Sequence, residues 1–301
     1  MVPILVIGSN SRQNGKAKID CGVLHMPNVL TEEQVREFDE NGFLFPVEAY
    51  TPDEAASLHE NFAAMEKRLG HEPQKKFRIK AHLPFPWLCD VVRNENLLDA
   101  IEDILGPNIL CWGASFFTKK ANDPRFVSWH TDSFYYGLEP AETVTAWLAF
   151  NDATVESGCV QYIPGTHKGP PAIHEIKKHE HNLVQQGQTV IDVPEDKAIF
   201  AEVNAGQVVL HHESVVHGSG PNNANHPRVG FSIHYVAPHV KETRFDGATA
   251  MLVRGENVGD NWGIDPQPQH DYDPDCIKFM ENTRAKFTNT TADKIAVGGR
   301  S

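Results

Sequence analysis

Six short segments in the middle of the chain constrain its fold more than any other feature of the sequence. Each is rich in β-forming residues and is bounded by glycine, proline or asparagine, and together they span residues 108–119, 143–151, 158–163, 197–203, 206–212 and 228–237. Short strands at such spacing are typical of an antiparallel sandwich or barrel. We therefore expect these segments to form a β structure of that kind.

Three amphipathic segments precede the strands. Thr31 begins a capping-box pattern, Thr51-Pro52 combines a cap with a first-turn proline, and a third helical pattern spans roughly Glu95 to Leu105. Because the helices come before the strands, we expect an α+β fold in which helices buttress one face of a barrel.

The domain organisation follows from the same patterns. Residues 1–29 carry little periodicity and are expected to form an extended leader, residues 30–285 a single domain, and residues 286–301 a C-terminal tail. Residues 168–196 also carry little periodicity. A long insertion of this kind inside a barrel is more often a functional lid than a linker, so we expect a lid-like segment there.

Charge and cysteine content exclude several classes of partner. The sequence has 40 acidic and 27 basic residues, a formal charge of −13, which argues against binding to nucleic-acid phosphates. The apolar stretch at residues 1–8 is too short to span a membrane and lacks the basic flank of a secretion signal. Five scattered cysteines without a C-x-x-C pair indicate a reducing compartment, so we expect a cytoplasmic protein. We make no prediction of its oligomeric state.

A His-x-Asp motif is the first candidate for chemistry. His130 and Asp132 are two residues apart in an expected extended segment, where residues i and i+2 point to the same face. A histidine from a later strand would complete a two-histidine, one-carboxylate triad, and His211, His212 and His217 are the candidates. Such a triad leaves three metal positions open for a co-substrate and dioxygen. The alternative interpretation is a hydrogen-bonded histidine and aspartate at a strand end.

Five sequence blocks in a fixed order carry a family resemblance. They are Phe116–Lys119, Trp129–Asp132, Val144–Trp147, Gly158–Gly169, and His217–Asn222 followed by Arg228. In these blocks the chain resembles the phytanoyl-CoA dioxygenase family of iron(II)- and 2-oxoglutarate-dependent oxygenases, over about residues 30 to 240. The resemblance implies a double-stranded β-helix, the jelly-roll barrel of the cupins.

The resemblance also implies the site residues. His130, Asp132 and His217 would be the metal ligands, since the following turn and the spacing to the arginine favour His217 over the other late histidines. His211 would then be a core histidine or a partner of a ligand. Arg228 would pair with the far carboxylate of 2-oxoglutarate, because a guanidinium grips a carboxylate through two parallel hydrogen bonds. Residues that would help it are Ser219, Trp147 and Lys119. The alternative for Arg228 is an ordinary surface arginine.

The activity implied is a dioxygenase that uses iron(II), 2-oxoglutarate and O2 and releases succinate and CO2. It would hydroxylate, desaturate or cyclise an unactivated C–H bond of a small metabolite: an amino acid, an amine or aminophosphonate, or a secondary-metabolite scaffold. Candidate substrate residues are Phe134, Tyr135 and Tyr136, which follow the motif directly, and His82 in a Pro-rich loop. The alternatives are a metal-binding cupin without oxygenase activity and a non-enzymatic binding module.

Overall fold

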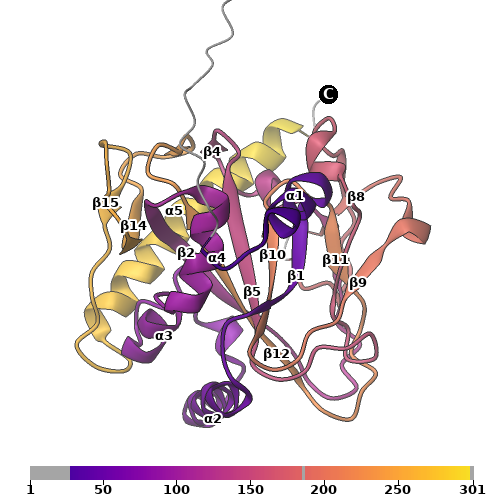
Figure 1. Ribbon diagram of the computed structural model, residues 1–301, viewed down its shortest axis with the longest axis horizontal. Helices are drawn as coiled ribbons and strands as arrows, with labels where there is room; N and C mark the ends of the chain where they lie inside the picture. The colour runs from indigo at the N-terminus through magenta and orange to yellow at the C-terminus, as the bar shows by residue number, and fades with distance from the viewer. Residues whose placement is uncertain (1–27, 185–186, 299–301) are drawn as a thin grey trace, which may run out of the picture.

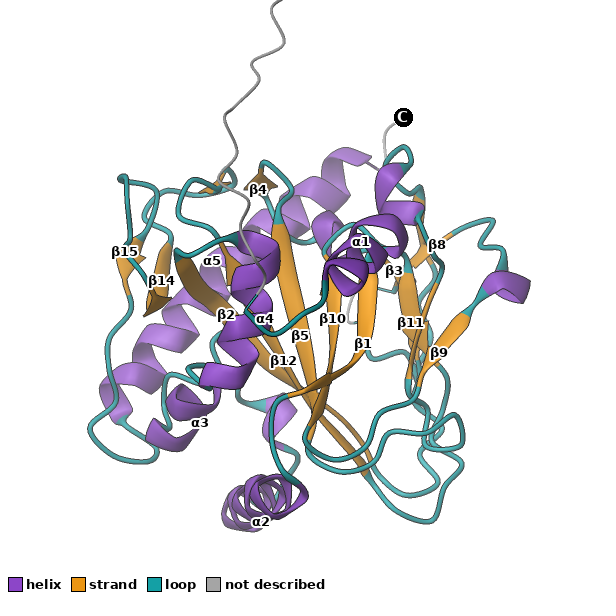
Figure 2. Cartoon of the chain, viewed as in Figure 1, coloured by secondary structure: helices purple, strands orange, loops and turns teal. Residues whose placement is uncertain are grey.

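The computed structural model describes residues 28–184 and 187–298, and its strands form two main sheets (Figures 1 and 2). The larger sheet has the order β1 (Phe43–Glu48), β10 (Gln207–His212), β5 (Thr143–Ala149), β12 (Arg228–Val236), β2 (Ile109–Lys119), β14 (Thr249–Arg254) and β15 (Gly263–Ile264). The smaller sheet has the order β3 (Val127–His130), β11 (His217–Ser219), β6 (Val160–Tyr162) and β9 (Ile199–Ala201). Each of the six segments expected to form a strand contains one, and only β14 and β15 pair in parallel in these two sheets.

Two short pairs of strands lie outside the main sheets. One joins β4 (Leu138–Glu139) to β13 (Lys241–Glu242). The other joins β7 (His174–Ile176) to β8 (Gln188–Val190) and falls within the expected lid-like segment. That segment is therefore partly ordered as a hairpin, whose strand β8 lies beside β3 of the smaller sheet.

One face of the larger sheet packs against helices, and the other face lines a cavity. Along β12, residues 229, 231, 233 and 235 belong to the main hydrophobic cluster together with side chains of the helices, whereas Arg228, Ser232 and His234 point to the opposite face and line a cavity. Successive side chains of a strand point to opposite faces, so one strand serves both layers. On the cavity side, a second cluster joins Trp147 and Val209 of the larger sheet to Val160 and Tyr162 of the smaller one.

Five α-helices lie in the described part of the chain. They are α1 (Glu32–Asn41), α2 (Pro52–Leu69), α3 (Pro86–Val91), α4 (Glu95–Leu105) and α5 (Pro274–Gly298). The expected capping box is present at Thr31, the expected cap and first-turn proline are present at Thr51-Pro52, where the cap is also a capping box, and α4 has the expected bounds. The loop expected before the third helix contains α3. No helix among the described residues is long and apolar enough to cross a membrane.

The C-terminus differs from the expectation. A tail was expected from residue 286, but α5 continues through that position to Gly298. Phe287 packs against Phe245 and Trp112, with ring centroids 4.9 and 6.0 Å apart, so this part of the helix covers the fold. Residues 1–27 of the expected leader lie outside the described residues. From Asn28 to Leu30 the backbone amides donate to the carboxylate of Asp103 on α4.

The close approach of Gly230 to the Trp147 ring gives a first prediction. A Cβ added at Gly230 would fall well inside van der Waals contact with that ring. We expect Gly230→Ala to lower the free energy of unfolding by about 1–3 kcal/mol, because overpacking forces the ring to move. Gly220→Ala is the control, since a Cβ there meets no atom within 4 Å. Urea denaturation of both variants checks this, and wild-type stability for Gly230→Ala would contradict it.

Candidate active site

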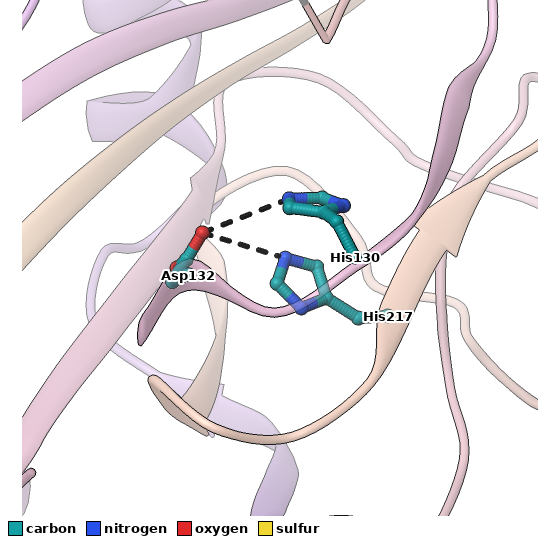
Figure 3. A group of neighbouring side chains, drawn as sticks. All are labelled: His130, Asp132 and His217. Carbon is teal, nitrogen blue, oxygen red and sulfur yellow. Dashed lines mark ion pairs between the residues drawn. The ribbon is translucent and has the colours of Figure 1, made fainter. Parts of the chain in front are cut away.

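His130, Asp132 and His217 converge at the facing ends of two strands of the smaller sheet. His130 ends β3, His217 begins β11, and the two are cross-strand partners. Asp132 begins a 3-10 turn one residue beyond extended Thr131, so it points to the same side as His130. The Nε2 atoms of His130 and His217 lie 3.6 and 3.9 Å from Oδ1 of Asp132 (Figure 3). The donor atoms of this group lie within 4.8 Å of one another and could hold a metal ion.

Hydrogen bonds fix the tautomer of both histidines. Nδ1 of His130 lies 2.8 Å from the carbonyl oxygen of Ser128, and Nδ1 of His217 lies 3.0 Å from that of Val215. Because a carbonyl only accepts, each Nδ1 carries the proton and each Nε2 presents a lone pair. Burial, followed by the charge of His130, lowers the pKa of His217 well below its usual value, which keeps its ring neutral. Two neutral imidazoles beside a carboxylate fit a divalent metal of the transition series.

Asp132 is held by neighbours on the larger sheet. Nε2 of His211 lies 3.3 Å from Oδ2, and the Thr145 hydroxyl lies 3.4 Å from the same oxygen, which leaves Oδ1 facing the two histidines. Burial raises the pKa of Asp132, but the hydrogen bond from His211 and the surrounding imidazole rings outweigh it and hold the pKa well below its usual range. Asp132 is therefore ionised at any pH near neutrality.

His211 is thus a partner of Asp132. Its Nδ1 accepts from the Tyr162 hydroxyl at 2.9 Å, which leaves Nε2–H to donate to the aspartate. His211 lies on β10 and His217 on β11, and these two strands belong to different sheets. Packing of the two sheets, rather than alternation along one strand, therefore brings the two histidines together. His212 points elsewhere, with its Nδ1 accepting from the Ser214 amide.

Arg228 is buried and lines the same cavity of about 450 Å³ as the metal-binding group, and we call the buried part of the wall at Arg228 the floor. Its Nη1 and Nη2 donate to the carbonyls of Gly158 and Phe117 at 2.6 and 3.4 Å, and its Nε has no partner among the described residues. No described carboxylate forms an ion pair with it. Its Cζ lies 5.1 Å from the centre of the Trp147 ring. A buried guanidinium without a carboxylate fits an anionic ligand that enters the cavity.

Lys119 contacts a residue that lines the cavity but does not line the cavity itself. Its Nζ donates to the Ser219 hydroxyl at 2.7 Å and to the Gly220 carbonyl, and Lys119 does not line the cavity, whereas Ser219 does. Burial, followed by the positive charge of Arg228, lowers the pKa of Lys119 to about 6. At neutral pH its amine is therefore largely uncharged, and Arg228 carries the positive charge of the floor. The expectation that Lys119 contacts the co-substrate is corrected accordingly.

Two of the four expected substrate residues line the cavity and two do not. Tyr135 and Tyr136 are part of its wall. Phe134 faces away from it, and its ring packs against His174 at 4.5 Å. His82 is completely buried beside Cys89, whose thiol contacts its carbonyl, and it does not reach the cavity. The assignment of His82 as a substrate residue is therefore wrong, because its side chain is buried outside the cavity.

Several lining residues were missed from the sequence. His234 is buried with its Nδ1 3.0 Å from both the Thr145 and the Tyr136 hydroxyls, and alternation from Arg228 along β12 could have found it. Other lining residues are Arg78, Leu183 and Val184 from connecting segments, and Arg284, Phe287 and Thr288 from α5. No local pattern marks these, since only tertiary packing brings them to the cavity.

The comparisons with known proteins agree with this geometry. A model of the phytanoyl-CoA dioxygenase (PhyH) family matches residues 21–230. The chain belongs to this family. Human peroxisomal phytanoyl-CoA dioxygenase is 26% identical over 257 residues, which cover 77% of this chain and 76% of that protein. A probable alpha-ketoglutarate-dependent hypophosphite dioxygenase of Stutzerimonas stutzeri is 25% identical over 234 residues, 68% of this chain and 78% of that protein.

Solved structures give the same result for this PhyH-family chain. The non-heme monooxygenase ThoJ in its apo form has a TM-score of 0.76 and 26% identity, and the match covers 87% of this chain and 99% of that one. Its nickel complex has a TM-score of 0.70 and 27% identity, covering 86% and 99%. The predictions of a 2-oxoglutarate-dependent non-haem iron dioxygenase, and of iron and 2-oxoglutarate as its cofactors, are confirmed.

The buried residue Glu213 contacts the turn that carries Asp132. The carbonyl of Glu213 accepts from the Ser133 amide at 2.9 Å, and its side chain is buried. Burial, followed by the charge of Asp132, raises the pKa of Glu213 to about 8. The folded protein therefore holds a proton on Glu213 that the unfolded chain releases above its ordinary pKa of about 4.3.

This difference predicts a pH dependence of stability. The stabilisation from protonated Glu213 is complete below about pH 4.3 and is lost as the pH rises to about 8. Gln resembles the protonated carboxyl group and does not titrate, so we expect Glu213→Gln to become progressively more stable than the wild type between these limits. Urea denaturation of both metal-free proteins at pH 6 and pH 8.5 measures the difference. Parallel pH profiles would show that Glu213 is ionised in the folded state.

Proposed function

We propose that His130, Asp132 and His217 bind one iron(II) ion and that Arg228 binds the far carboxylate of 2-oxoglutarate. One observation carries the proposal: two Nε2 lone pairs and a carboxylate oxygen from remote parts of the chain meet in a cavity that Arg228 also lines, and this buried guanidinium has no carboxylate partner among the described residues. When bound, the iron supplies the activation of dioxygen, with 2-oxoglutarate as the reductant. The balanced reaction is 2-oxoglutarate plus O2 plus R–H giving succinate, CO2 and R–OH.

The residues of this chain position and shield the reactants. The Nδ1–H groups of His130 and His217 stay on backbone carbonyls, so both rings keep their orientation. His211 and Thr145 hold one oxygen of Asp132 and leave the other to the metal. Apolar side chains of the cavity wall exclude water from the target C–H bond. Because Asp132 occupies the carboxylate position, we favour hydroxylation, or desaturation or cyclisation by the same chemistry, over halogenation.

The proposal extends to the type of barrel, the number of domains and the cellular compartment. The two sheets, with the metal-binding residues at the end of the smaller one, are consistent with a double-stranded β-helix within a single domain. The four cysteines among the described residues are buried free thiols, which suits a reducing compartment such as the cytoplasm.

We propose a small metabolite as the substrate. The cavity of about 450 Å³ is of the size that small-molecule ligands occupy. Tyr135 and Tyr136 provide an aromatic wall close to Asp132. The complete donor set together with unpaired Arg228 favours an oxygenase over a binding module, since a binding module needs neither.

Removing the carboxylate ligand gives the direct test of the metal site. We expect Asp132→Ala to abolish substrate-dependent succinate formation and to weaken iron(II) binding, because only two of three protein ligands remain. Anaerobic iron titration and succinate assay measure the two effects. Asp196→Ala, which removes an exposed carboxylate, is the control. A variant that keeps wild-type activity would refute the ligand assignment.

Replacing Arg228 distinguishes the binding of the co-substrate from the binding of the metal. We expect Arg228→Ala to raise the 2-oxoglutarate concentration needed for half-maximal succinate formation roughly 100-fold, the value of two charge-assisted hydrogen bonds. Iron(II) affinity measured without 2-oxoglutarate should stay near that of the wild type. Equal losses of iron and 2-oxoglutarate affinity would count against the proposed role of Arg228.

A further inference from the structure

A second group of cationic side chains lines the cavity, and these side chains are at least partly exposed, unlike buried Arg228. We call the part of the wall that they form the opening. Lys75, Arg78, Arg125 and Arg284 line the cavity, and Asp132 is the only acidic residue among the described side chains that line it. This balance is the reverse of that of the whole chain, which has a formal charge of −13.

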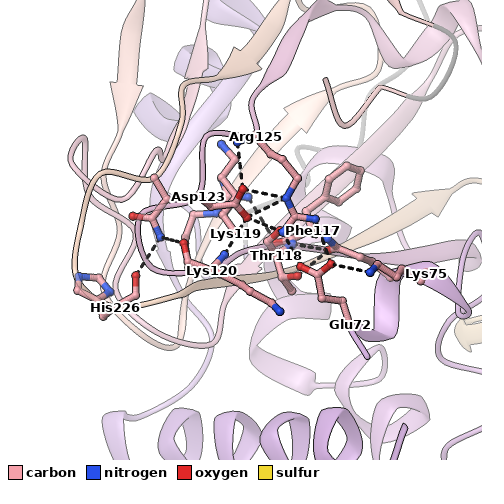
Figure 4. Close-up of polar contacts among 12 residues, drawn as sticks. Glu72, Lys75, Phe117, Thr118, Lys119, Lys120, Asp123, Arg125 and His226 are labelled. Carbon is pink, nitrogen blue, oxygen red and sulfur yellow. Dashed lines mark hydrogen bonds and ion pairs between the residues drawn. The ribbon is translucent and has the colours of Figure 1, made fainter. Parts of the chain in front are cut away.

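Two of these cations already have carboxylate partners. Arg125 donates to Glu72 and Asp123, including Nη1 to Oε2 of Glu72 at 3.0 Å and Nε to Oδ2 of Asp123 at 2.8 Å (Figure 4). Lys75 lies 3.7 Å from the same glutamate. Arg125 and Lys75 therefore belong to an internal ion-pair network that needs no ligand.

Arg78 and Arg284 differ from them. The only hydrogen bond given by the Arg78 side chain within the described residues joins its Nε to the Gln74 carbonyl at 2.8 Å, and no ion pair there involves either arginine. Both side chains are half-buried. Arg78 and Arg284 line the same cavity, and burial, followed by the positive charge of Arg284, lowers the pKa of Arg78. Two unpaired, partly desolvated cations lose free energy that an anion between them would restore.

The co-substrate cannot be that anion if it occupies the floor. On β12, Ser232 follows Arg228 by four residues and pairs with Ser115 of β2, whose hydroxyl accepts from the amide next to Arg78, that of Ile79, at 3.1 Å. Four residues of strand span about 13 Å. The backbones of Arg228 and Arg78 are therefore well separated along the sheet. In the proposed function both carboxylates of 2-oxoglutarate are already engaged, the far one by Arg228 and the other by the metal, so neither is left for Arg78.

We propose that Arg78 and Arg284 form a second anion site, which binds a carboxylate, phosphate or phosphonate group of the oxidised substrate. The apolar part of that substrate lies between this site and the metal-binding residues, against Tyr135, Leu183 and Phe287 of the cavity wall. The assignment of the anion to the substrate rests on the proposed function. It narrows the substrate to a small organic acid and favours an amino acid or aminophosphonate over a simple amine.

The test uses small anions, which fit the site whatever the shape of the substrate. The full chain is loaded with nickel(II) and saturated with 2-oxoglutarate, so that turnover is blocked and Arg228 is occupied. Inorganic phosphate, methylphosphonate and acetate are then titrated at constant ionic strength by calorimetry. We expect at least one of them to bind, and its affinity to fall about tenfold or more in Arg78→Gln and in Arg284→Gln, because each removes one charge-assisted contact. The phosphorus anions and acetate distinguish phosph(on)ate from carboxylate recognition.

Matched variants exclude a general effect of charge. Arg284→Lys keeps the positive charge and should retain affinity within about threefold, whereas Lys278→Gln removes a charge from an exposed position of the same helix and should leave affinity unchanged. Binding of no anion by the wild type, or equal binding by the wild type and both arginine variants, overturns the second anion site. If 2-oxoglutarate itself fails to bind, the proposed function fails instead, and the same titrations on the protein alone still test Arg78 and Arg284.

Discussion

The alternation of side chains along β12 is the constraint on which the rest of this structure depends. One face of the strand is fully apolar and packs against the helices, so the other face, with Arg228, Ser232 and His234, is fixed toward the cavity. A shift of the strand by one residue would exchange the two faces and bury the arginine among the helices. The hydrophobic packing on one side thereby determines where the charged group on the other side lies.

The same sheet also orients Asp132, which lies in the turn that follows strand β3 of the smaller sheet. Asp132 contacts His211 of β10 and Thr145 of β5, and these two are cross-strand partners of each other. Thr145 is in turn the partner of His234 on β12. A single row of polar side chains across three strands therefore supports the carboxylate, and packing of the two sheets brings that row to the two histidines of the smaller sheet.

Much of this could be predicted from the sequence because it is local. Capping boxes at Thr31 and Thr51, the bounds of α4 and the six strand segments are encoded by residues close together in the chain. The motif around His130 and Asp132 is equally local. By contrast, the burial of His82 outside the cavity, the packing of Phe287 and the contribution of Arg284 to the cavity depend on contacts between remote segments. Local periodicity carries no information about which surface such a segment will cover.

The charges of the cavity also order the ligands along it. Arg228 on the floor and the pair Arg78 and Arg284 at the opening are the cations without carboxylate partners among its described lining residues, and the metal-binding group lines the same cavity. A co-substrate held at the floor and a substrate held by its acidic group at the opening would have their other ends close together near Asp132. The distance from the acidic group to the metal-binding residues would then determine which carbon of the substrate is placed for oxidation.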